Sequence, residues 1–257
     1  MSWIPLRTAD GSWTLRHGGH GEACHSRSGA WLEARERYAR ACRLPERSAA
    51  EGALRLLDVG TGLGLNIAAG LEALAPAGIA LQVVTLERER EVVEAGIALY
   101  GRLEARVGPW TPFVDQVHRA LRIALSLSSA QAGGHGVPLG AQGSLRLLVG
   151  DARAEIARLA GEAPFAAVFL DPFSPPREPE LWEESFLAAL ARRMGSGSWL
   201  STYSAAFAVR LGLARAGLRV GQGPAVGAKA EGTLASPDRD PPPLPPAVTR
   251  RLLRELG

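Results

Sequence analysis

The chain has few of the residues that metal sites and disulfide frameworks need. Its two cysteines are Cys24 and Cys42, and their spacing matches neither a zinc motif nor a disulfide framework. We expect both to be small buried residues, and the sequence predicts no metal site. Lysine is nearly absent as well, because Lys229 is the only one, so almost all of the positive charge is carried by arginine.

The chain also lacks long apolar runs. None approaches the roughly 18 residues that a membrane-spanning helix needs, and the N-terminus shows no signal-peptide pattern. A hydrophobic content of 46% and a mean hydropathy of +0.01 are typical of a soluble globular protein. The net charge of +3 permits a polyanionic partner without requiring one. We therefore expect a cytoplasmic protein with no membrane partner.

Apolar, β-prone runs alternate with helical patterns along most of the chain. Strands are expected at 54–59, 81–86, 145–149, 165–170, 198–203, 218–221 and 232–235, and helices at 64–74, 88–100, 152–159 and 179–193. This alternation predicts an α/β fold with a mostly parallel, seven-stranded sheet and helices on both faces.

The chain is expected to divide into three regions: an extension before this core, the core domain itself, and a tail after it. Residues 1–50 form an N-terminal extension or cap, irregular over 1–20 and helical over 29–43. Residues 51–236 form the main domain, with a variable insertion at about 108–143 whose part 126–142 is rich in Ser, Gly and Ala and is expected to be mobile. Residues 237–257 form a proline-rich tail with a short basic helix.

The turn after the first core strand is rich in glycine. In Asp58-Val-Gly-Thr-Gly-Leu-Gly-Leu-Asn66, the three glycines Gly60, Gly62 and Gly64 allow a tight turn and a close approach to a ligand. Their spacing does not meet the G-x-G-x-x-G dinucleotide fingerprint, and the lack of a following lysine excludes a phosphate-binding P-loop. On its own, this turn does not specify its ligand.

Two acidic residues follow later strands and give the turn a context. Glu87 ends the second core strand, where a carboxylate can accept both hydroxyls of a ribose. Asp151 follows the strand 145–149. Together with the glycine turn they resemble the S-adenosylmethionine (SAM) site of Rossmann-like class I methyltransferases, in which an acid at the position of Asp151 contacts the adenine. The alternatives are a solvated charge for Glu87 and a helix N-cap for Asp151.

The strand 165–170 leads into Asp171, followed by Pro172, Phe173 and more prolines. Ligands of open α/β sheets bind beyond the carboxyl ends of strands. Asp171 and the Pro172 carbonyl can accept hydrogen bonds from a substrate N–H, and the Phe173 ring can stack on a base. An alkyl amine has a pKa of roughly 10, however, and the sequence does not show how such an amine would lose its proton.

The run Asp171-Pro-Phe-Ser-Pro-x-x-x-Pro-Glu-Leu-Trp182 closely resembles the methyltransferase module of the MnmC family. Further matching segments are His25-Ser26, Gly29-Ala30, Glu33, Gly60 to Asn66, Tyr203-Ser204-Ala205 and Gly227-Ala-Lys229. The resemblance implies a SAM-dependent methyltransferase that converts the 5-aminomethyl group of the wobble (2-thio)uridine of tRNA to 5-methylaminomethyl. Its partners would be tRNA and either a separate flavin oxidoreductase or the enzyme that installs the aminomethyl group, because the chain is too short to contain the flavin domain of the bifunctional proteins.

The resemblance also implies residue roles. Asp171 would orient the amine, and Phe173 or Tyr203 would pack on the uridine. Arg177 and Lys229 would contact phosphate, although Ala230 and Glu231 follow Lys229 where the family usually has an arginine. The cofactor would be held by Glu33, Gly60, Thr61, Gly62, Gly64, Asn66, Glu87, Asp151 and Asp171.

Three other functions stay open at this point. An aminopropyltransferase shares the fold and an Asp-Pro loop, but Val168 stands where that family has a second acid. A small-molecule amine methyltransferase fits the modest net charge. A non-catalytic SAM-binding subunit of a tRNA-modifying complex is the third alternative, against which the intact Asp171 and glycine turn argue.

Overall fold

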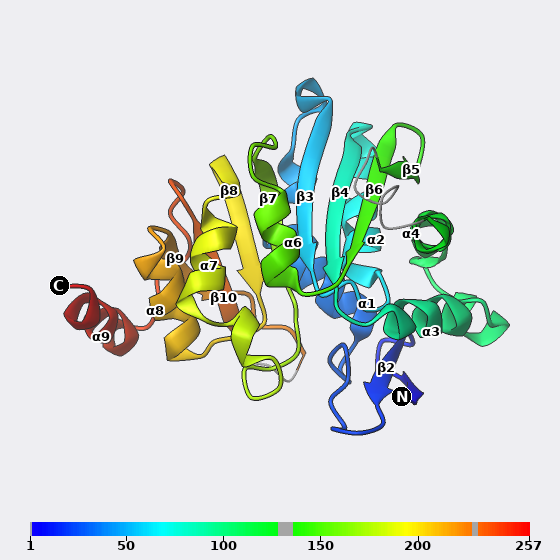
Figure 1. Cartoon of the computed structure of the whole chain (residues 1–257), viewed down its shortest axis with the longest axis horizontal. Coiled ribbons are helices and arrows are strands. Elements are labelled where there is room, and N and C mark those ends of the chain that lie inside the picture. The colour runs from blue at the N-terminus through cyan, green and yellow to red at the C-terminus, as the bar shows by residue number, and fades with distance from the viewer. Residues whose placement is uncertain (1, 128–135, 228–230) are drawn as a thin grey trace.

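A computed structural model describes residues 2–127, 136–227 and 231–257. Its centre is an eight-stranded sheet in the order β5-β6-β4-β3-β7-β8-β10-β9 (Figure 1). The strands are β3 (Ala53–Val59), β4 (Ala80–Glu87), β5 (Val137–Leu139), β6 (Gly143–Val149), β7 (Phe165–Leu170), β8 (Met194–Thr202), β9 (Arg219–Gly223) and β10 (Gly232–Ser236). The five strands from β6 to β8 in this order are parallel, whereas β5 and β10 run antiparallel to their neighbours.

The seven core strands expected from the sequence are confirmed, and β5 is an additional one. It pairs with β6 through Val137 opposite Leu145, inside the segment 126–142 that was expected to be a mobile surface insertion. That expectation was wrong for 137–139, and the expected strand number of seven was one too low. A three-residue strand with Pro138 at its centre is too short to show periodicity, and a proline is tolerated because β5 lies at the edge of the sheet. Residues 128–135 of the same segment lie outside the described residues.

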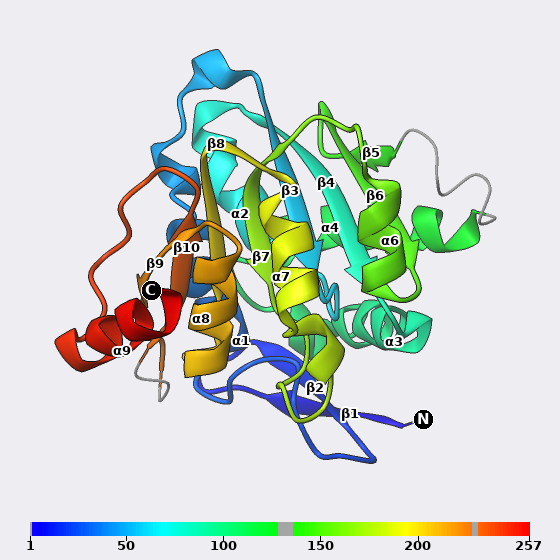
Figure 2. The same cartoon turned by 60° about the vertical axis from the view of Figure 1, so that its left-hand side comes forward.

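Helices cover both faces of the sheet because the strand residues alternate between two cores. In β3, Leu56 belongs to one core and Leu57 to the other, and both side chains are fully buried. The first core lies beneath α1 (Ala30–Glu33), its π-helical continuation η1 (Ala34–Arg40), α2 (Leu65–Leu74), α3 (Arg90–Tyr100) and α4 (Thr111–Ser126). The second lies beneath α6 (Ala152–Arg158), α7 (Glu184–Ala191) and α8 (Phe207–Arg215) (Figure 2).

The helix expected over 179–193 is interrupted. Pro179–Leu181 form a single 3-10 turn, η6, and Glu183 is extended before α7 begins. Further 3-10 turns are η2 (Leu44–Glu46), η3 (Ala49–Glu51), η4 (Ala75–Ala77) and η5 (Leu103–Arg106). The turn η6 therefore belongs to the loop after β7 and not to the helical layer.

The N-terminal segment is a β-hairpin, so the expectation of an irregular segment at 1–20 was wrong. Strands β1 (Trp3–Arg7) and β2 (Trp13–His17) pair antiparallel. Asp10 stabilises the turn between them, because its carboxylate accepts the Ser12 amide at 3.0 Å and the Thr8 hydroxyl at 2.7 Å. Asp10-Gly11 is a hairpin signal that could have identified this turn from the sequence.

The hairpin lies near the carboxyl ends of the core strands, below α1 and α3 in Figure 1. At the other side of the molecule, the tail ends in helix α9 (Pro246–Leu256), which packs beside α8 with Arg251 over the ring of Phe207 at 3.8 Å. No helix among the described residues is long and apolar enough to cross a membrane.

The loops that follow β3, β4, β6 and β7 lie at the carboxyl ends of these parallel strands, and the hairpin lies at the same end of the sheet.

Candidate active site

A cavity of about 420 Å³ opens where these loops and the hairpin meet. Its volume lies within the usual range of small-molecule sites, roughly 300–1,000 Å³. The glycine turn after β3, the end of β4, the start of α6 and the loop after β7 all contribute to its wall, and Trp3 and residues 22–25 close it from the hairpin side. This is the position at which open α/β sheets bind their ligands.

The glycine turn brings backbone close to the cavity. At Gly60 the φ angle is +90°, and a Cβ atom there would meet the carbonyl oxygen of Asp171 at 2.5 Å. Gly60 therefore has to be glycine for two reasons, conformation and space. Thr61 and Gly62 line the cavity beside it. Gly64 does not line the cavity. It is the N-cap of α2, and a Cβ there would meet Val117 at 2.9 Å.

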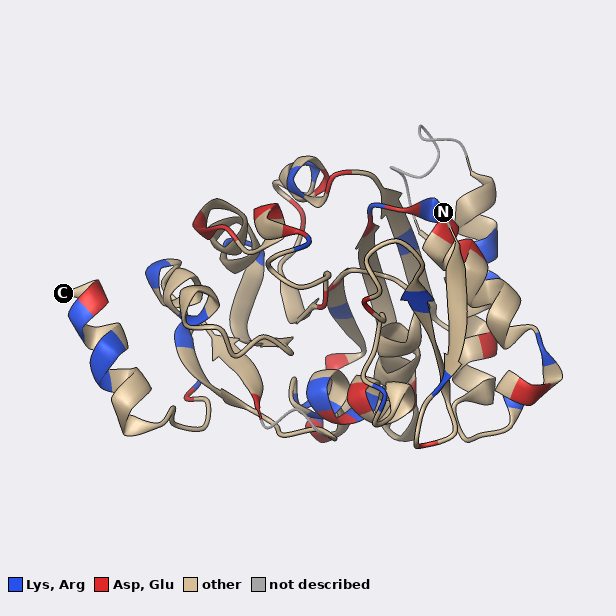
Figure 3. Ribbon diagram, turned by 90° about the horizontal axis from the view of Figure 1, so that it is seen from below, with Lys and Arg blue, Asp and Glu red and all other residues tan. Residues whose placement is uncertain are grey.

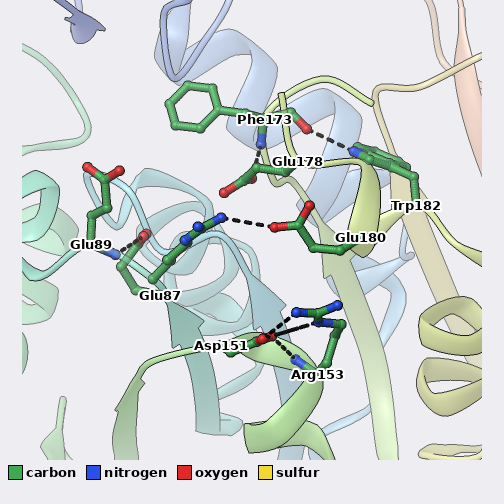
Figure 4. Close-up of polar contacts among 9 residues, drawn as sticks. Glu87, Glu89, Asp151, Arg153, Phe173, Glu178, Glu180 and Trp182 are labelled. Atoms are coloured by element: carbon green, nitrogen blue, oxygen red, sulfur yellow. Dashed lines mark hydrogen bonds and ion pairs between the residues drawn. The ribbon is translucent and has the colours of Figure 1, made fainter. Parts of the chain in front are cut away.

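Glu87 is held at the end of β4 by two backbone amides. One carboxylate oxygen accepts the Gly62 N–H and the other accepts the Glu89 N–H, both at 2.9 Å. Figure 4 shows the contact with Glu89. Burial raises the pKa of Glu87 to about 7. Each oxygen keeps a second lone pair, so the carboxylate can still accept the two hydroxyls of a ribose. The glycine turn, Glu87 and the cavity volume together fit the adenosine part of SAM.

A second acid, Asp58, supports the turn from beneath. It is fully buried and accepts the Thr85 hydroxyl at 2.7 Å, and Thr85 in turn contacts the Thr61 hydroxyl at 2.5 Å. Burial raises the pKa of Asp58 well above its usual range, which favours the neutral acid. Asp58 does not line the cavity, so its contribution is to fix the turn that does.

Asp171 projects from the end of β7 and lines the same cavity. Its backbone N–H bonds to the Val59 carbonyl at 2.9 Å, which joins the loop after β7 to the glycine turn. One carboxylate oxygen accepts the hydroxyl of Tyr38, and the other accepts the side-chain amide of Asn66 at 2.8 Å. Two neutral donors from the buried side thus fix the direction of this carboxylate.

Tyr38 and Asn66 stand behind Asp171 and not in the cavity wall. Both are buried, with 0% and 4% of their surface exposed. Asn66 was expected among the residues that hold the cofactor, but its side-chain amide contacts Asp171 and the residue does not line the cavity. Tyr38 was missed by the sequence reasoning, since a tyrosine within a helical pattern has no spacing that distinguishes it from a core residue.

The residues after Asp171 form a rigid loop. The Pro172 carbonyl, which was expected to accept an N–H of the substrate, accepts the Tyr203 hydroxyl at 3.0 Å. The Trp182 indole N–H donates to the Phe173 carbonyl at 2.8 Å, and the Phe173 N–H donates to Glu178 at 2.8 Å. Phe173 and Tyr203 both line the cavity, whereas Trp182 packs in the second core.

Glu33 and Asp151 both line the cavity. Glu33 is 3% exposed, accepts the Ser26 amide at 2.6 Å and pairs with the buried Arg37 at 3.3 Å. Asp151 caps α6 by accepting the Arg153 N–H, and it also pairs with the Arg153 side chain at 2.6 Å (Figure 4). The N-cap interpretation of Asp151 is confirmed, and its place in the wall keeps the adenine contact possible as well.

The wall is strongly acidic although the chain as a whole is slightly basic. Among the residues that the structure describes, eight acidic residues line it and two arginines, Arg88 and Arg153. The carboxylates belong to Glu22, Glu33, Glu87, Glu89, Asp151, Asp171, Glu178 and Glu180. Figure 4 shows that several of them come from three separate segments. Burial raises the pKa of Glu178. The excess of acidic over basic side chains in the wall favours cationic ligands, including a sulfonium and an ammonium.

Of the two residues expected to contact phosphate, the structure describes Arg177 but not Lys229. Arg177 is exposed at the outer side of the loop after β7, where it pairs with Glu22 at 3.4 Å, and Glu22 also accepts the Ser174 hydroxyl at 2.6 Å. Lys229 lies outside the described residues. Seen from this end in Figure 3, acidic and basic residues are interspersed over the described surface.

Neither cysteine is part of a metal site in the described structure. Cys24 lines the cavity and Cys42 is buried in the first core, and burial raises the pKa of both thiols. Within the ranges that the structure describes, no group of three or more His, Cys, Asp and Glu residues is arranged to hold a metal ion. The chemistry of the wall is therefore that of carboxylates, backbone amides and aromatic rings.

Comparison with known proteins agrees with this geometry. Residues 118–238 match the model of a family described as S-adenosyl-L-methionine-dependent methyltransferase. The chain is 32% identical over 231 residues to the tRNA 5-methylaminomethyl-2-thiouridine biosynthesis bifunctional protein MnmC of Chromobacterium violaceum, an alignment that covers 84% of this chain and 33% of the relative. The MnmC protein of Chromohalobacter salexigens is also 32% identical, with 86% of this chain and 31% of the relative covered. The chain thus spans about a third of the length of these relatives.

One solved structure extends the match to nearly the whole chain. The crystal structure of MNMC2 from Aquifex aeolicus superimposes with a TM-score of 0.75 at 29% identity, covering 98% of this chain and 76% of the other. The Rossmann-like fold and SAM as cofactor, both expected from the sequence, are confirmed. The cavity geometry and these similarities support a SAM-dependent methyltransferase that corresponds to the methyltransferase module of the MnmC proteins.

Proposed function

We propose that the chain methylates the 5-aminomethyl group of the wobble (2-thio)uridine in tRNA, giving 5-methylaminomethyl. The observation that carries this proposal is the position of Asp171, whose carboxylate is fixed by Tyr38 and Asn66 in the wall of the cavity that also contains the glycine turn and Glu87. An acceptor for an N–H is thus placed beside the site that fits the cofactor. The names of the relatives supply the tRNA substrate.

The residues of the cavity divide between cofactor and substrate. Gly60, Thr61, Gly62 and Glu87 would hold the adenosine part of SAM, which when bound supplies an electrophilic methyl group. Asp171 accepts an N–H of the substrate amine and so directs the nitrogen lone pair toward that methyl group. The nitrogen lone pair would form the new N–C bond, the sulfur would keep the electron pair of the C–S bond, and the proton of the resulting ammonium would leave to solvent water.

The acidic wall has two opposing effects on the amine. It favours the ammonium form and so helps to bind the substrate, but only the neutral amine can act as a nucleophile. Tyr38 and Asn66 moderate the second effect, because both donate to the carboxylate that the amine contacts. The methyl transfer rate is therefore expected to rise with pH as the amine deprotonates, since an alkyl ammonium has a pKa of about 10.

The proposal extends to the surroundings of the reaction. We assign the main domain to residues 51–236, with 1–50 as a cap over the cavity and 237–257 as a tail, and we place the protein in the cytoplasm with its tRNA. The substrate amine would come from a separate flavin oxidoreductase or from the enzyme that installs the aminomethyl group. The relatives are named bifunctional proteins and this chain spans about a third of their length, which supports a second activity as the supplier.

The test uses SAM with a labelled methyl group and two acceptors. One is tRNA whose wobble uridine carries 5-aminomethyl, and the other is a free alkyl amine at the same concentration. Nuclease digestion and chromatography should locate the label in 5-methylaminomethyluridine. Label in the free amine and none in the tRNA would instead establish a small-molecule amine methyltransferase.

A further inference from the structure

A buried arginine stands directly behind the acidic wall of the cavity. Arg37 lies in η1, and none of its side-chain surface is exposed. Its Nε lies 3.3 Å from a carboxylate oxygen of Glu33, which lines the cavity and keeps 4% of its side-chain surface accessible. Arg37 itself does not line the cavity. A ligand can therefore reach Glu33 but not the guanidinium group behind it.

Contacts from other parts of the chain fix this arginine. Its Nη1 donates to the carbonyl of Pro224, which follows β9, at 3.1 Å. The backbone carbonyl of Arg37 accepts the hydroxyl of Ser201 in β8. A Cβ atom on Gly232 in β10 would meet Nη1 at 2.5 Å, so the guanidinium group packs directly against this glycine. The position of Arg37 relative to Glu33 is thus set by the sheet.

Stability alone does not account for such a buried charge. Removing a guanidinium group from water is costly, and replacing a buried ion pair with apolar side chains of similar volume is often neutral or stabilising. The Nη2 of Arg37 is buried without a hydrogen-bond partner among the described residues, which adds to the cost. We therefore looked to the acid that Arg37 contacts for its function.

Arg37 belongs to an uncommon helical segment. The segment η1 is π-helical over seven residues, and π-helical turns occur frequently at functional sites. Its consecutive residues Arg37 and Tyr38 are both fully buried. Arg37 contacts Glu33, and Tyr38 contacts Asp171. One segment behind the wall thus holds two of the carboxylates that line the cavity.

We propose that Arg37 is a positioning residue, which holds the Glu33 carboxylate in the orientation and charge state that accept the ammonium group in the amino-acid part of SAM. Without Arg37, this carboxylate would be an uncompensated charge among other acids, and it would turn away or become neutral. The charge of Arg37 also repels the ammonium group, but leaving Glu33 unpaired in a buried site is the larger effect. The inference goes beyond the proposed function, because it rests on SAM as the cofactor and not on the amine that is methylated.

Two ligands separate the amino-acid part of the cofactor from its adenosine part. S-adenosylhomocysteine carries the ammonium group, whereas methylthioadenosine lacks the whole amino-acid part. Calorimetric titration measures the Kd of each ligand. Arg37→Met removes the charge and keeps an unbranched side chain. Arg210→Met is the matched control, because Arg210 is also a buried arginine, 2% exposed, but its partner Glu231 does not line the cavity.

We expect Arg37→Met to raise the Kd of S-adenosylhomocysteine about tenfold or more, the effect of one hydrogen bond to a charged group. The Kd of methylthioadenosine should stay within about twofold of wild type, and Arg210→Met should leave both values within this range. If Arg37→Met fails to fold, Arg37→Lys against Arg210→Lys decides the question. Arg37→Lys keeps the charge without the planar guanidinium group, so it alone should raise the Kd of S-adenosylhomocysteine, by about threefold.

A double variant tests whether Arg37 acts through Glu33. Glu33→Gln removes the charged acceptor by itself, so adding Arg37→Met to it should weaken the binding of S-adenosylhomocysteine no further. Additive losses would show that Arg37 acts independently of Glu33, and the inference would be wrong.

The two ligands also show how the inference can fail. Equal losses for both ligands in Arg37→Met would mean that Arg37 only supports the fold of the site. Unchanged Kd values for both would mean that Glu33 does not need Arg37 to hold the cofactor. Either result overturns the inference. A wild-type protein that binds S-adenosylhomocysteine but leaves aminomethyl tRNA unmethylated would refute the proposed function and leave this inference intact.

Discussion

The contact between Tyr38 and Asp171 gives the sharpest single prediction. Tyr38→Phe removes only the hydroxyl that donates to the Asp171 carboxylate and leaves a ring of nearly the same shape in the first core. A hydrogen bond to a charged group contributes about 1.5–3 kcal/mol, and every 1.4 kcal/mol in a barrier changes a rate about tenfold. We therefore expect kcat for methyl transfer to fall about ten- to a hundredfold.

The Kd of SAM should change by less than about twofold, because Tyr38 does not line the cavity. Single-turnover methyl transfer to aminomethyl tRNA at saturating SAM measures the first quantity, and calorimetric titration measures the second. This combination distinguishes Tyr38 as a positioning residue from one that merely supports the fold, since general loosening of the site would weaken SAM binding as well.

Tyr100→Phe is the matched control. Tyr100 is also a buried tyrosine, and its hydroxyl bonds only to the Trp13 backbone among the contacts that the structure describes, at 2.9 and 3.1 Å. Tyr38→Phe loses one hydrogen bond and Tyr100→Phe loses two, so the control should lose at least as much unfolding free energy, about 1 kcal/mol per bond, but only Tyr38→Phe should slow the chemistry. Equal kcat values for the two variants, or a parallel loss of SAM affinity in Tyr38→Phe, would refute the positioning role.

Three further predictions concern the cofactor site and the RNA. Burial raises the pKa of Glu87 to about 7, and ribose hydroxyls can bond to its ionised form. Calorimetry should therefore show that the affinity for SAM falls by up to about tenfold per pH unit below pH 7 and is constant above it. Glu87→Gln should abolish this pH dependence, and a dependence that persists in the variant would exclude Glu87 as its cause. Gly60→Ala should prevent SAM binding, because its Cβ meets the Asp171 carbonyl. The control is Gly78→Ala, at a similar positive φ of +65° with nothing within 4 Å of its Cβ, and this variant should bind SAM normally. Similar SAM affinities for the two variants would contradict the claim that the backbone at Gly60 must lie close to the Asp171 carbonyl. Arg177→Ala should reduce the salt dependence of tRNA binding by less than one unit of log–log slope, because Glu22 already neutralises part of its charge; a decrease of one unit or more would show that Arg177 leaves Glu22 for a phosphate.

The sequence was informative where a pattern has a local physical cause. The core strands, the glycine turn and the position of Asp171 follow from apolar runs and from the rule that ligands bind beyond strand ends. The hairpin was missed because its evidence is a short Asp10-Gly11 turn between two five-residue strands. The role of Tyr38 depends on which face of a π-helical segment meets β7, and such a long-range packing outcome has no local signal.

The charge of the cavity is likewise a property of the fold. Its eight carboxylates come from five separate segments, and in the sequence each is compensated by nearby arginines. Only the folded chain shows that the carboxylates face inward while most arginines lie outside the wall. The uneven distribution of the two signs, and not their totals, is what favours a cationic cofactor and a cationic amine.

The division of the cavity between cofactor and amine is tested most directly by Asp171→Ala, with SAM affinity and methyl transfer to aminomethyl tRNA measured on the same preparation. Asp171 contacts the substrate amine in our account, so this variant should bind SAM with nearly unchanged Kd and show no detectable turnover. A large loss of SAM affinity would place Asp171 in the cofactor site and contradict the account. Turnover near the wild-type rate would show that the amine is oriented by another group.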